Sequence, residues 1–142
     1  MSPSIAVHNR QRAIKIDIVR LQGFAERALE LALKSRARKI RPQKLSHIDV
    51  ILVSDRLMTE LHRRFLQIAG PTDVITFQHG EIFISVETAR RQASAYRTSL
   101  KDELQLYVIH GLLHLRGFDD KSASRGRVMR VRQDRILREA SK

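Results

Sequence analysis

The sequence of 142 residues contains no cysteine. This absence excludes disulfide-stapled scaffolds, thiol catalysis and every zinc or iron–sulfur site built on thiolates. No apolar run approaches the roughly 18 residues of a membrane span, and the N-terminus lacks the apolar stretch of a signal peptide. Aromatic residues are few, and no RNP-type RNA-binding motif is present. These absences predict a cytoplasmic protein without a membrane partner.

Acidic residues are also scarce: 15 Asp and Glu stand against 27 Lys and Arg, which gives a formal net charge of +12. The excess lies in two stretches, Lys34–Lys44 with six basic residues and no acid, and 121–142 with eight basic residues and two acids. Such a balance indicates a polyanionic partner, above all nucleic acid, or alternatively a basic surface kept for solubility.

What is present favours one compact domain over residues 1–142, with hydrophobic residues (42%) sufficient for a core. Residue patterns predict strands at Ile5–His8, His47–Val53, Asp73–Phe77 and Glu81–Val86, the last two as a hairpin. Amphipathic spacing and capping residues predict helices from Asp17 to the basic stretch, from Ser54 or Asp55 to Gly70, and over Glu87–Tyr96, Ser99–Leu115 and Ser122–Glu139. The class is therefore α/β or α+β.

The segment Leu104–Leu115 is apolar almost all round, which predicts a buried central helix. It nevertheless carries His110 and His114, one turn apart on one face, a spacing at which two imidazoles can share a metal ion. Asp119 and Asp120 follow the helix, and either carboxylate can complete a His₂–carboxylate zinc site with an open fourth position. The structural alternative is a pair of core histidines satisfied by hydrogen bonds.

The residue after the first histidine is Gly111. Zinc proteases with an H-E-x-x-H motif carry a glutamate there as the general base. The sequence therefore disfavours peptide hydrolysis.

Three sequence blocks resemble the YbeY family. His110–Asp120 is similar to its signature H-G-x-L-H-L-x-G-Y-D-H, Pro71–Phe77 to P-T-D-V-L-S-F, and Gly80–Arg90 to G-D-I-x-I-s-x-E-x-A. The resemblance covers about residues 45–140. It implies a bacterial, cytoplasmic, metal-dependent endoribonuclease, a hydrolase of rRNA maturation and ribosome quality control. It also implies a small mixed, mostly parallel four-stranded sheet with about five helices around the histidine helix.

The resemblance assigns one zinc ion to His110, His114 and Asp120, with Asp119 and Asp73 supporting the site. Water activated by that metal is expected to attack a phosphodiester of single-stranded RNA. Asp120 stands where the family has a third histidine. The carboxylate lowers the charge of the site from +2 to +1, so we expect a less acidic water and a weaker pull on phosphate.

A second departure is Leu66, which stands where the family has an arginine thought to act in catalysis. Arg63, one turn earlier, and Arg116 are the substitutes we expect to contact the phosphate. Basic residues expected to contact RNA, in rRNA of the small ribosomal subunit, are Lys39, Arg41, Arg125 and Arg127. Loss of the family arginine leaves an alternative: a weakened or inactive metal-containing factor that binds RNA or the ribosome.

Overall fold

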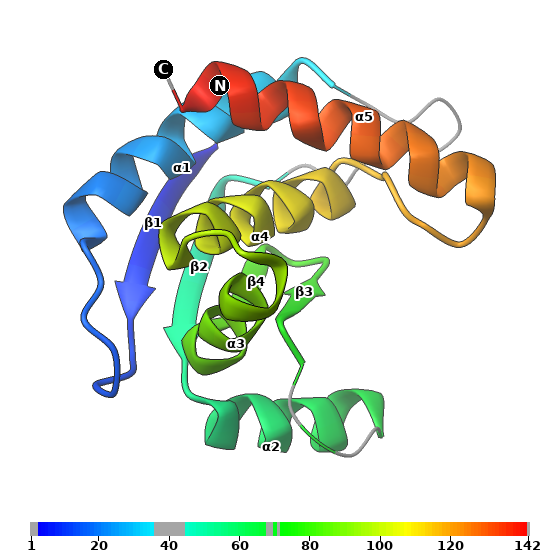
Figure 1. Ribbon diagram of the computed structural model, residues 1–142. Coiled ribbons are helices and arrows are strands. Elements are labelled where there is room, and N and C mark those ends of the chain that lie inside the picture. Colours follow the sequence, from blue (N-terminus) through cyan, green and yellow to red (C-terminus); the bar gives the residue numbers. More distant parts are fainter. Residues whose placement is uncertain (1–2, 36–44, 68–69, 71, 142) are drawn as a thin grey trace.

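A computed structural model describes residues 3–35, 45–67, 70 and 72–141, and these form four strands and five helices (Figure 1). In chain order they are β1 (Ser4–Asn9), α1 (Ile18–Leu33), β2 (His47–Val53), α2 (Asp55–Leu66), β3 (Val74–Phe77), β4 (Glu81–Ser85), α3 (Val86–Tyr96), α4 (Leu100–Leu115) and α5 (Ala123–Ala140). No helix in the described part is long and apolar enough to cross a bilayer. The predicted α/β class is confirmed.

The four strands form one mixed sheet in the order β1-β2-β4-β3. β1, β2 and β4 run parallel, and β3 pairs antiparallel with β4. The β3–β4 hairpin turns at Gly80, whose φ of 110° favours glycine. The sheet is thus mostly parallel, as predicted.

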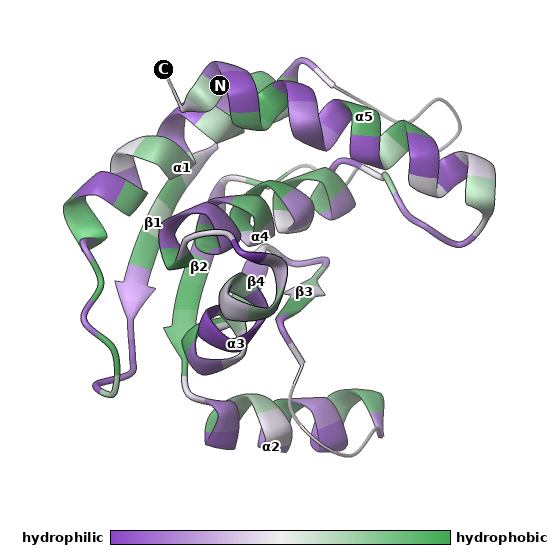
Figure 2. Ribbon diagram, viewed as in Figure 1, coloured by the Kyte–Doolittle hydropathy of each residue, from purple (hydrophilic) through white to green (hydrophobic). Residues whose placement is uncertain are grey.

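The two faces of the sheet are covered unequally. On one face, Ile82 and Ile84 of β4 belong to the main core, which also holds buried residues of α1, α4 and α5. On the other face, Val53 and Ile75 form a small cluster with Met58 of α2. Figure 2 shows α4 as the most uniformly hydrophobic helix and α5 as alternating hydrophobic and hydrophilic. Ten of the 16 residues of α4 are buried, which confirms the predicted burial of the histidine helix.

Serine and aspartate caps fix the starts of the helices. The side chains of Asp17, Ser54, Ser99 and Ser122 each accept a hydrogen bond from the backbone N–H three residues later. Each satisfies an amide that the helix itself leaves unpaired. The helix starts predicted at these positions are therefore confirmed.

The end of α2 differs from the prediction. The helix was expected to reach Gly70, but it ends at Leu66, where Gln67 takes a left-handed conformation (φ 57°) and donates its N–H to the Arg63 carbonyl. Phe65, in the last turn of α2, is 55% exposed, and Met58 is the buried residue of the helix.

Candidate active site

The candidate site is built on α4, which packs closely against β4. At Gly111 a Cβ atom would lie 2.7–2.9 Å from side-chain carbons of Ile82. A residue with any side chain would push the helix away from the sheet. The glycine between the two histidines therefore serves close packing.

His110 and His114 face each other. Their Nε2 atoms are 2.9 Å apart, and both side chains are partly buried. Two nitrogens that share a tetrahedral zinc ion lie about 3.4 Å apart, given zinc–nitrogen bonds of about 2.1 Å. A small rotation of either ring would meet that geometry. Two of the three predicted ligands are thus brought together.

The environment of the pair orients the ring of His110 and disfavours the charged form of His114. His110 Nδ1 lies 3.2 Å from Gln133 Oε1 of α5, an acceptor that keeps the proton on Nδ1 and leaves the lone pair on Nε2. Burial, then the charge of His110, lowers the pKa of His114, against a backbone hydrogen bond with Phe118. Neutral imidazole is the form that binds metal.

The loop after α4 holds the acidic residues. Asp119 accepts hydrogen bonds from the Lys121 N–H (3.0 Å) and Arg125 Nη1 (3.4 Å). The Lys121 bond, then the charge of Arg125, lowers the pKa of Asp119 against slight desolvation. Asp120 is exposed and lies beside Gly126 in the first turn of α5. Both carboxylates raise the pKa of His114 through their charge, so both lie in its electrostatic neighbourhood.

The third ligand is not assembled. Among the described residues no group of three His, Cys, Asp or Glu side chains is positioned to hold an ion. Asp120 as a metal ligand therefore stays a prediction.

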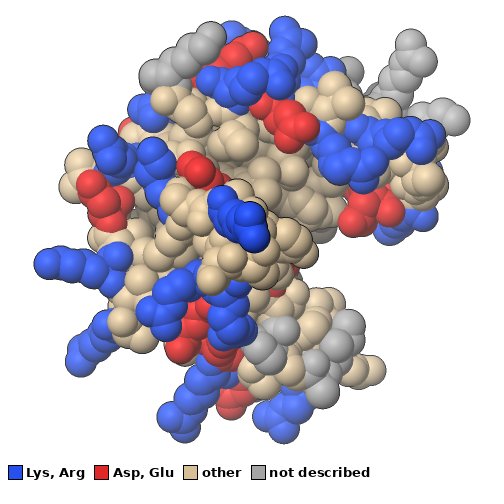
Figure 3. Space-filling model, in the orientation of Figure 1, with Lys and Arg blue, Asp and Glu red and all other residues tan. Residues whose placement is uncertain are grey.

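The predicted arginines occupy different places. Arg116 donates from Nε and Nη2 to the carbonyls of Ser35 (3.1 Å) and Leu33 (3.2 Å), and so ties α4 to the end of α1. Arg63 is exposed on α2, which packs on the opposite face of the sheet. Arg125 and Arg127 are exposed on α5, and Lys39 and Arg41 lie outside the described residues. Figure 3 shows basic side chains over α5 and a recess between the parts that carry α5 and α2.

A cleft of about 380 Å³ adjoins His110. Its walls come from the start of β3, α3, α4 and α5, and its lining residues are Asp73, Val74, Gln92, Tyr96, Glu103, Leu106, Tyr107, His110 and Gln133. The fold thus brings Asp73, a predicted site residue, to the same cleft as His110. Asp73 also accepts a hydrogen bond from the Val74 N–H (2.7 Å) at the start of β3.

The sequence analysis missed Glu103, Tyr107 and Gln133. The first two precede His110 by seven and three residues, so they share its face of α4. That spacing was a usable signal, because polar groups recur along one line of a helix that is otherwise apolar. Gln133 comes from another helix and gave no local signal.

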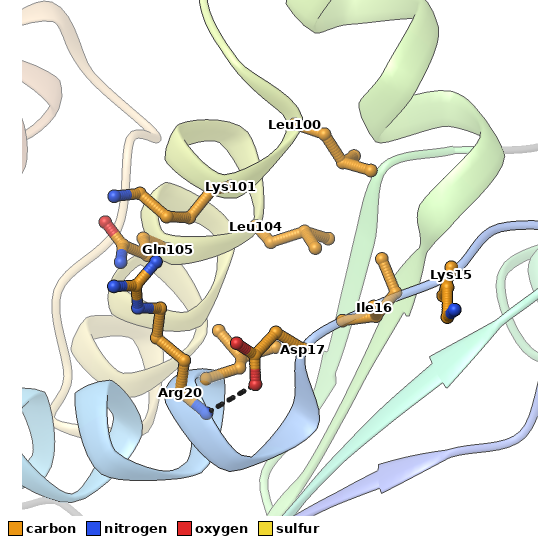
Figure 4. Close-up of a pocket in the computed structure, with 9 residues that line it drawn as sticks. Lys15, Ile16, Asp17, Arg20, Leu100, Lys101, Leu104 and Gln105 are labelled. Atoms are coloured by element: carbon orange, nitrogen blue, oxygen red, sulfur yellow. Dashed lines mark hydrogen bonds between the residues drawn. The ribbon is translucent and has the colours of Figure 1, made fainter.

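A second pocket, about 240 Å³, lies between the first turns of α1 and α4 (Figure 4). Its apolar part is formed by Ile16, Leu100 and Leu104, with Arg20 and Lys101 at one side. It contains none of the predicted site residues, so the candidate site is the cleft at His110.

Comparison with known proteins decides the family. The family described as Endoribonuclease YbeY matches residues 6–141. The chain belongs to the YbeY family. This confirms the resemblance and the predicted class of enzyme, an endoribonuclease.

Relatives from several bacteria agree. The Endoribonuclease YbeY of Gluconobacter oxydans is 36% identical over 121 residues, which cover 80% of this chain and 72% of that protein. The one of Syntrophus aciditrophicus is 31% identical over 135 residues, covering 86% and 79%. A solution structure from Thermotoga maritima matches 96% of this chain and 88% of its own, with a TM-score of 0.67 and 27% identity.

The YbeY signature of this chain occupies the C-terminal half of α4 and the loop after it. Its Gly117 has a φ of 95°, a conformation that side chains disfavour, and this turns the chain towards the acidic pair. Phe118 is buried in the main core, so this part of the loop packs against the body of the protein. The signature therefore combines two histidines with the turn that presents the carboxylates.

Proposed function

We propose that this protein is a zinc-dependent endonuclease of single-stranded RNA that acts in maturation and quality control of the small ribosomal subunit, in the bacterial cytoplasm. The observation that carries the proposal is the pair of Nε2 atoms of His110 and His114, which face each other at 2.9 Å. Membership of the YbeY family supports RNA as the substrate.

His110, His114 and Asp120 are the residues proposed to hold the ion. When bound, Zn²⁺ supplies Lewis-acid chemistry, polarising a phosphoryl oxygen and making water a stronger acid. Gln133 fixes the ring of His110, and burial keeps His114 neutral at physiological pH. Asp119 orients the loop that carries Asp120.

The basic side of the site is α5. Its exposed Arg125 and Arg127 follow the ligand loop directly, and single-stranded RNA held there would place a phosphate beside the histidine pair. Each phosphate contact releases bound counterions, so binding is expected to weaken steeply with salt.

The test begins with purified protein dialysed to remove metal, reloaded with zinc and analysed for bound metal. Single-stranded RNA, double-stranded RNA and single-stranded DNA are then offered with and without a chelator. We expect one zinc per chain and chelator-sensitive cleavage of single-stranded RNA. Protein that takes up no metal, or cleavage that the chelator leaves unchanged, would contradict the proposal.

A second candidate is a weakened or inactive factor that binds RNA or the ribosome. The supporting observation is Leu66, which is 48% exposed at the end of α2, at the position where the family resemblance places an arginine. The variant Leu66→Arg discriminates between the two. Increased cleavage with unchanged RNA binding favours the weakened factor, and unchanged cleavage favours an active enzyme that uses other cations.

A further inference from the structure

The pocket between the first turns of α1 and α4 contains a buried amide that has no partner (Figure 4). Gln105 of α4 is 6% exposed and lines this pocket. Its side chain makes no hydrogen bond to any residue that the structure describes, and its amide atoms are not completely enclosed. Buried polar side chains are paired in the large majority of cases. Gln105 is therefore available to bind a group that enters the pocket.

The pocket also has an excess of positive charge. Three of its nine lining residues are basic, Lys15, Arg20 and Lys101, and one is acidic, Asp17. Asp17 is engaged as the N-cap of α1, where its carboxylate accepts from the Arg20 N–H at 3.1 Å. The three cations make no ion pair within the described part of the chain. The first turns of two helices, which favour negative charge, add to this excess, so the pocket suits an anion.

The cationic and apolar parts of the pocket come from adjacent lines of α4. Lys101 and Gln105 are one turn apart on one line, and Leu100 and Leu104 on the next. Figure 4 shows the charged ends of Arg20 and Lys101 on the same side of the pocket as Gln105, with the two leucines turned the other way. The volume, about 240 Å³, lies below the roughly 300–1,000 Å³ of drug-sized sites. The pocket therefore suits a small group that is anionic at one end and apolar at the other.

The amide of Gln105 narrows the chemistry of that group. A glutamine side chain offers an N–H donor and a carbonyl acceptor together. A carboxylate without a neighbouring donor would leave the carbonyl facing negative charge. The C-terminal residue of a polypeptide carries an amide N–H beside its carboxylate, so it can use both. A free amino acid has an ammonium group in that place, which the cations of the pocket disfavour.

We propose that this pocket binds the C-terminal residue of a polypeptide, an apolar residue such as leucine with its free carboxylate. Arg20 and Lys101 bind the carboxylate, Gln105 pairs with the N–H of the residue, and Leu100 and Leu104 contact its side chain. The pocket shares no lining residue with the cleft of the candidate active site. The inference is therefore independent of the proposed nuclease.

The test uses N-acetyl-leucine as the probe and the full chain labelled for NMR. Three relatives of the probe each change one feature: N-acetyl-leucinamide lacks the carboxylate, leucine carries an ammonium group, and N-acetylglycine lacks the apolar side chain. Gln105→Leu removes an unpaired amide and keeps the size of the side chain, so it is expected to fold with an unchanged or higher Tm. Arg20→Met removes a cation, and Arg90→Met, at an exposed position on α3, is its matched control.

We expect N-acetyl-leucine to bind with a Kd of about 1 mM, and to shift the side-chain amide signals of Gln105 and the methyl signals of Leu100 and Leu104. Each of the three relatives should bind at least about tenfold more weakly, as should N-acetyl-leucine to Gln105→Leu and Arg20→Met. Arg90→Met should behave as wild type. A peptide that ends in leucine should bind at least as tightly as the probe, and its amidated form should not bind.

Two results would overturn the inference. The first is the absence of a saturable shift at these signals, or a shift that Gln105→Leu and Arg20→Met leave unchanged. The second is leucine binding as tightly as N-acetyl-leucine, which would make the pocket a site for a free amino acid. None of the probes is RNA, so either result leaves the proposed nuclease untouched.

Discussion

Two histidine pairs in this molecule are satisfied in opposite ways. On the face of the sheet that carries α2, His8 and His47 both donate from Nε2 to the same oxygen of Asp49, at 2.7 and 2.9 Å. On α4, His110 and His114 turn their Nε2 atoms towards each other, and no carboxylate lies between them in the described structure.

The difference shows what each pair needs. A carboxylate between two imidazoles accepts both protons, so the pair on the sheet is complete as it stands. Two facing nitrogens can share only one proton between them, and a bound cation is one group that can use both lone pairs together. The two α4 histidines are one helical turn apart with no carboxylate between them, an arrangement suited to a metal ion. The two sheet histidines share the carboxylate of Asp49, an arrangement that is structural.

The largest expected effect comes from removing one member of the α4 pair. His114→Ala removes a proposed ligand itself, so it should lower zinc affinity and chelator-sensitive RNA cleavage by more than about 100-fold. Substitution of a residue that only hydrogen-bonds to a ligand costs up to about that factor. His47→Ala, the matched change in the sheet pair, should retain both. Zinc titration and a single-turnover RNA assay measure the outcome, and equal losses in the two variants would erase the distinction.

The next prediction concerns the close packing of α4 against β4 at Gly111. Gly111→Ala should destabilise the fold by about 1–3 kcal/mol, because the new Cβ would lie under 3 Å from Ile82 carbons. Gly23→Ala on α1 is the control, since its Cβ would meet only the flexible end of Arg27 at 3.4 Å. That change should stabilise by about 0.5–1 kcal/mol. Urea unfolding measures both, and destabilisation of equal size would contradict the packing argument.

A smaller effect is expected from the outer partners of the two pairs. Gln133→Met removes the acceptor for His110 Nδ1 and should weaken zinc binding by about tenfold. Ser4→Ala removes the hydroxyl that lies 2.6 Å from His47 Nδ1 and should leave zinc affinity unchanged. Competition with a chromogenic zinc chelator gives both constants. Unchanged affinity in Gln133→Met would show that the ring of His110 is oriented without α5.

The smallest effect concerns acid stability of the sheet pair. The His8 hydrogen bond lowers the pKa of Asp49, with help from His47 and against burial. A carboxyl whose pKa is lower in the folded state stabilises above its unfolded value of 3.8, and this stabilisation is lost as pH falls through the folded pKa. Asp49→Asn should therefore be less stable than wild type at about pH 5, with a gap that closes towards about pH 3. A gap that widens in acid would reverse the sign and refute the assignment.

Local chemistry explains which parts of the fold were predictable. The caps Asp17, Ser54, Ser99 and Ser122 act within three residues, so the sequence alone located them. The end of α2 was not predictable in this way. Its left-handed terminator is Gln67, a residue type with no preference for that conformation, whereas Gly70 gave a stronger but misleading stop signal.

In the site, too, features fixed by neighbouring residues were predictable, and features that depend on distant segments were not. His110 and His114 were found because their relation is fixed by one helical turn. The cleft needs β3, α3, α4 and α5 to meet, and the contact between His110 and Gln133 joins residues 23 positions apart. Arg116 looked catalytic beside the ligand loop, but its donors reach carbonyls more than 80 positions away, at Leu33 and Ser35.

The bond between Gln133 and His110 has a thermodynamic consequence. It makes α5, the helix with the basic side chains, a direct partner of one proposed ligand. Under the proposed function, an RNA that favoured one position of α5 would change the affinity of the histidine pair for the proposed ion, and linkage would require the ion to change RNA affinity by the same factor. Zinc affinity measured in the absence of RNA would then differ from the affinity on the substrate.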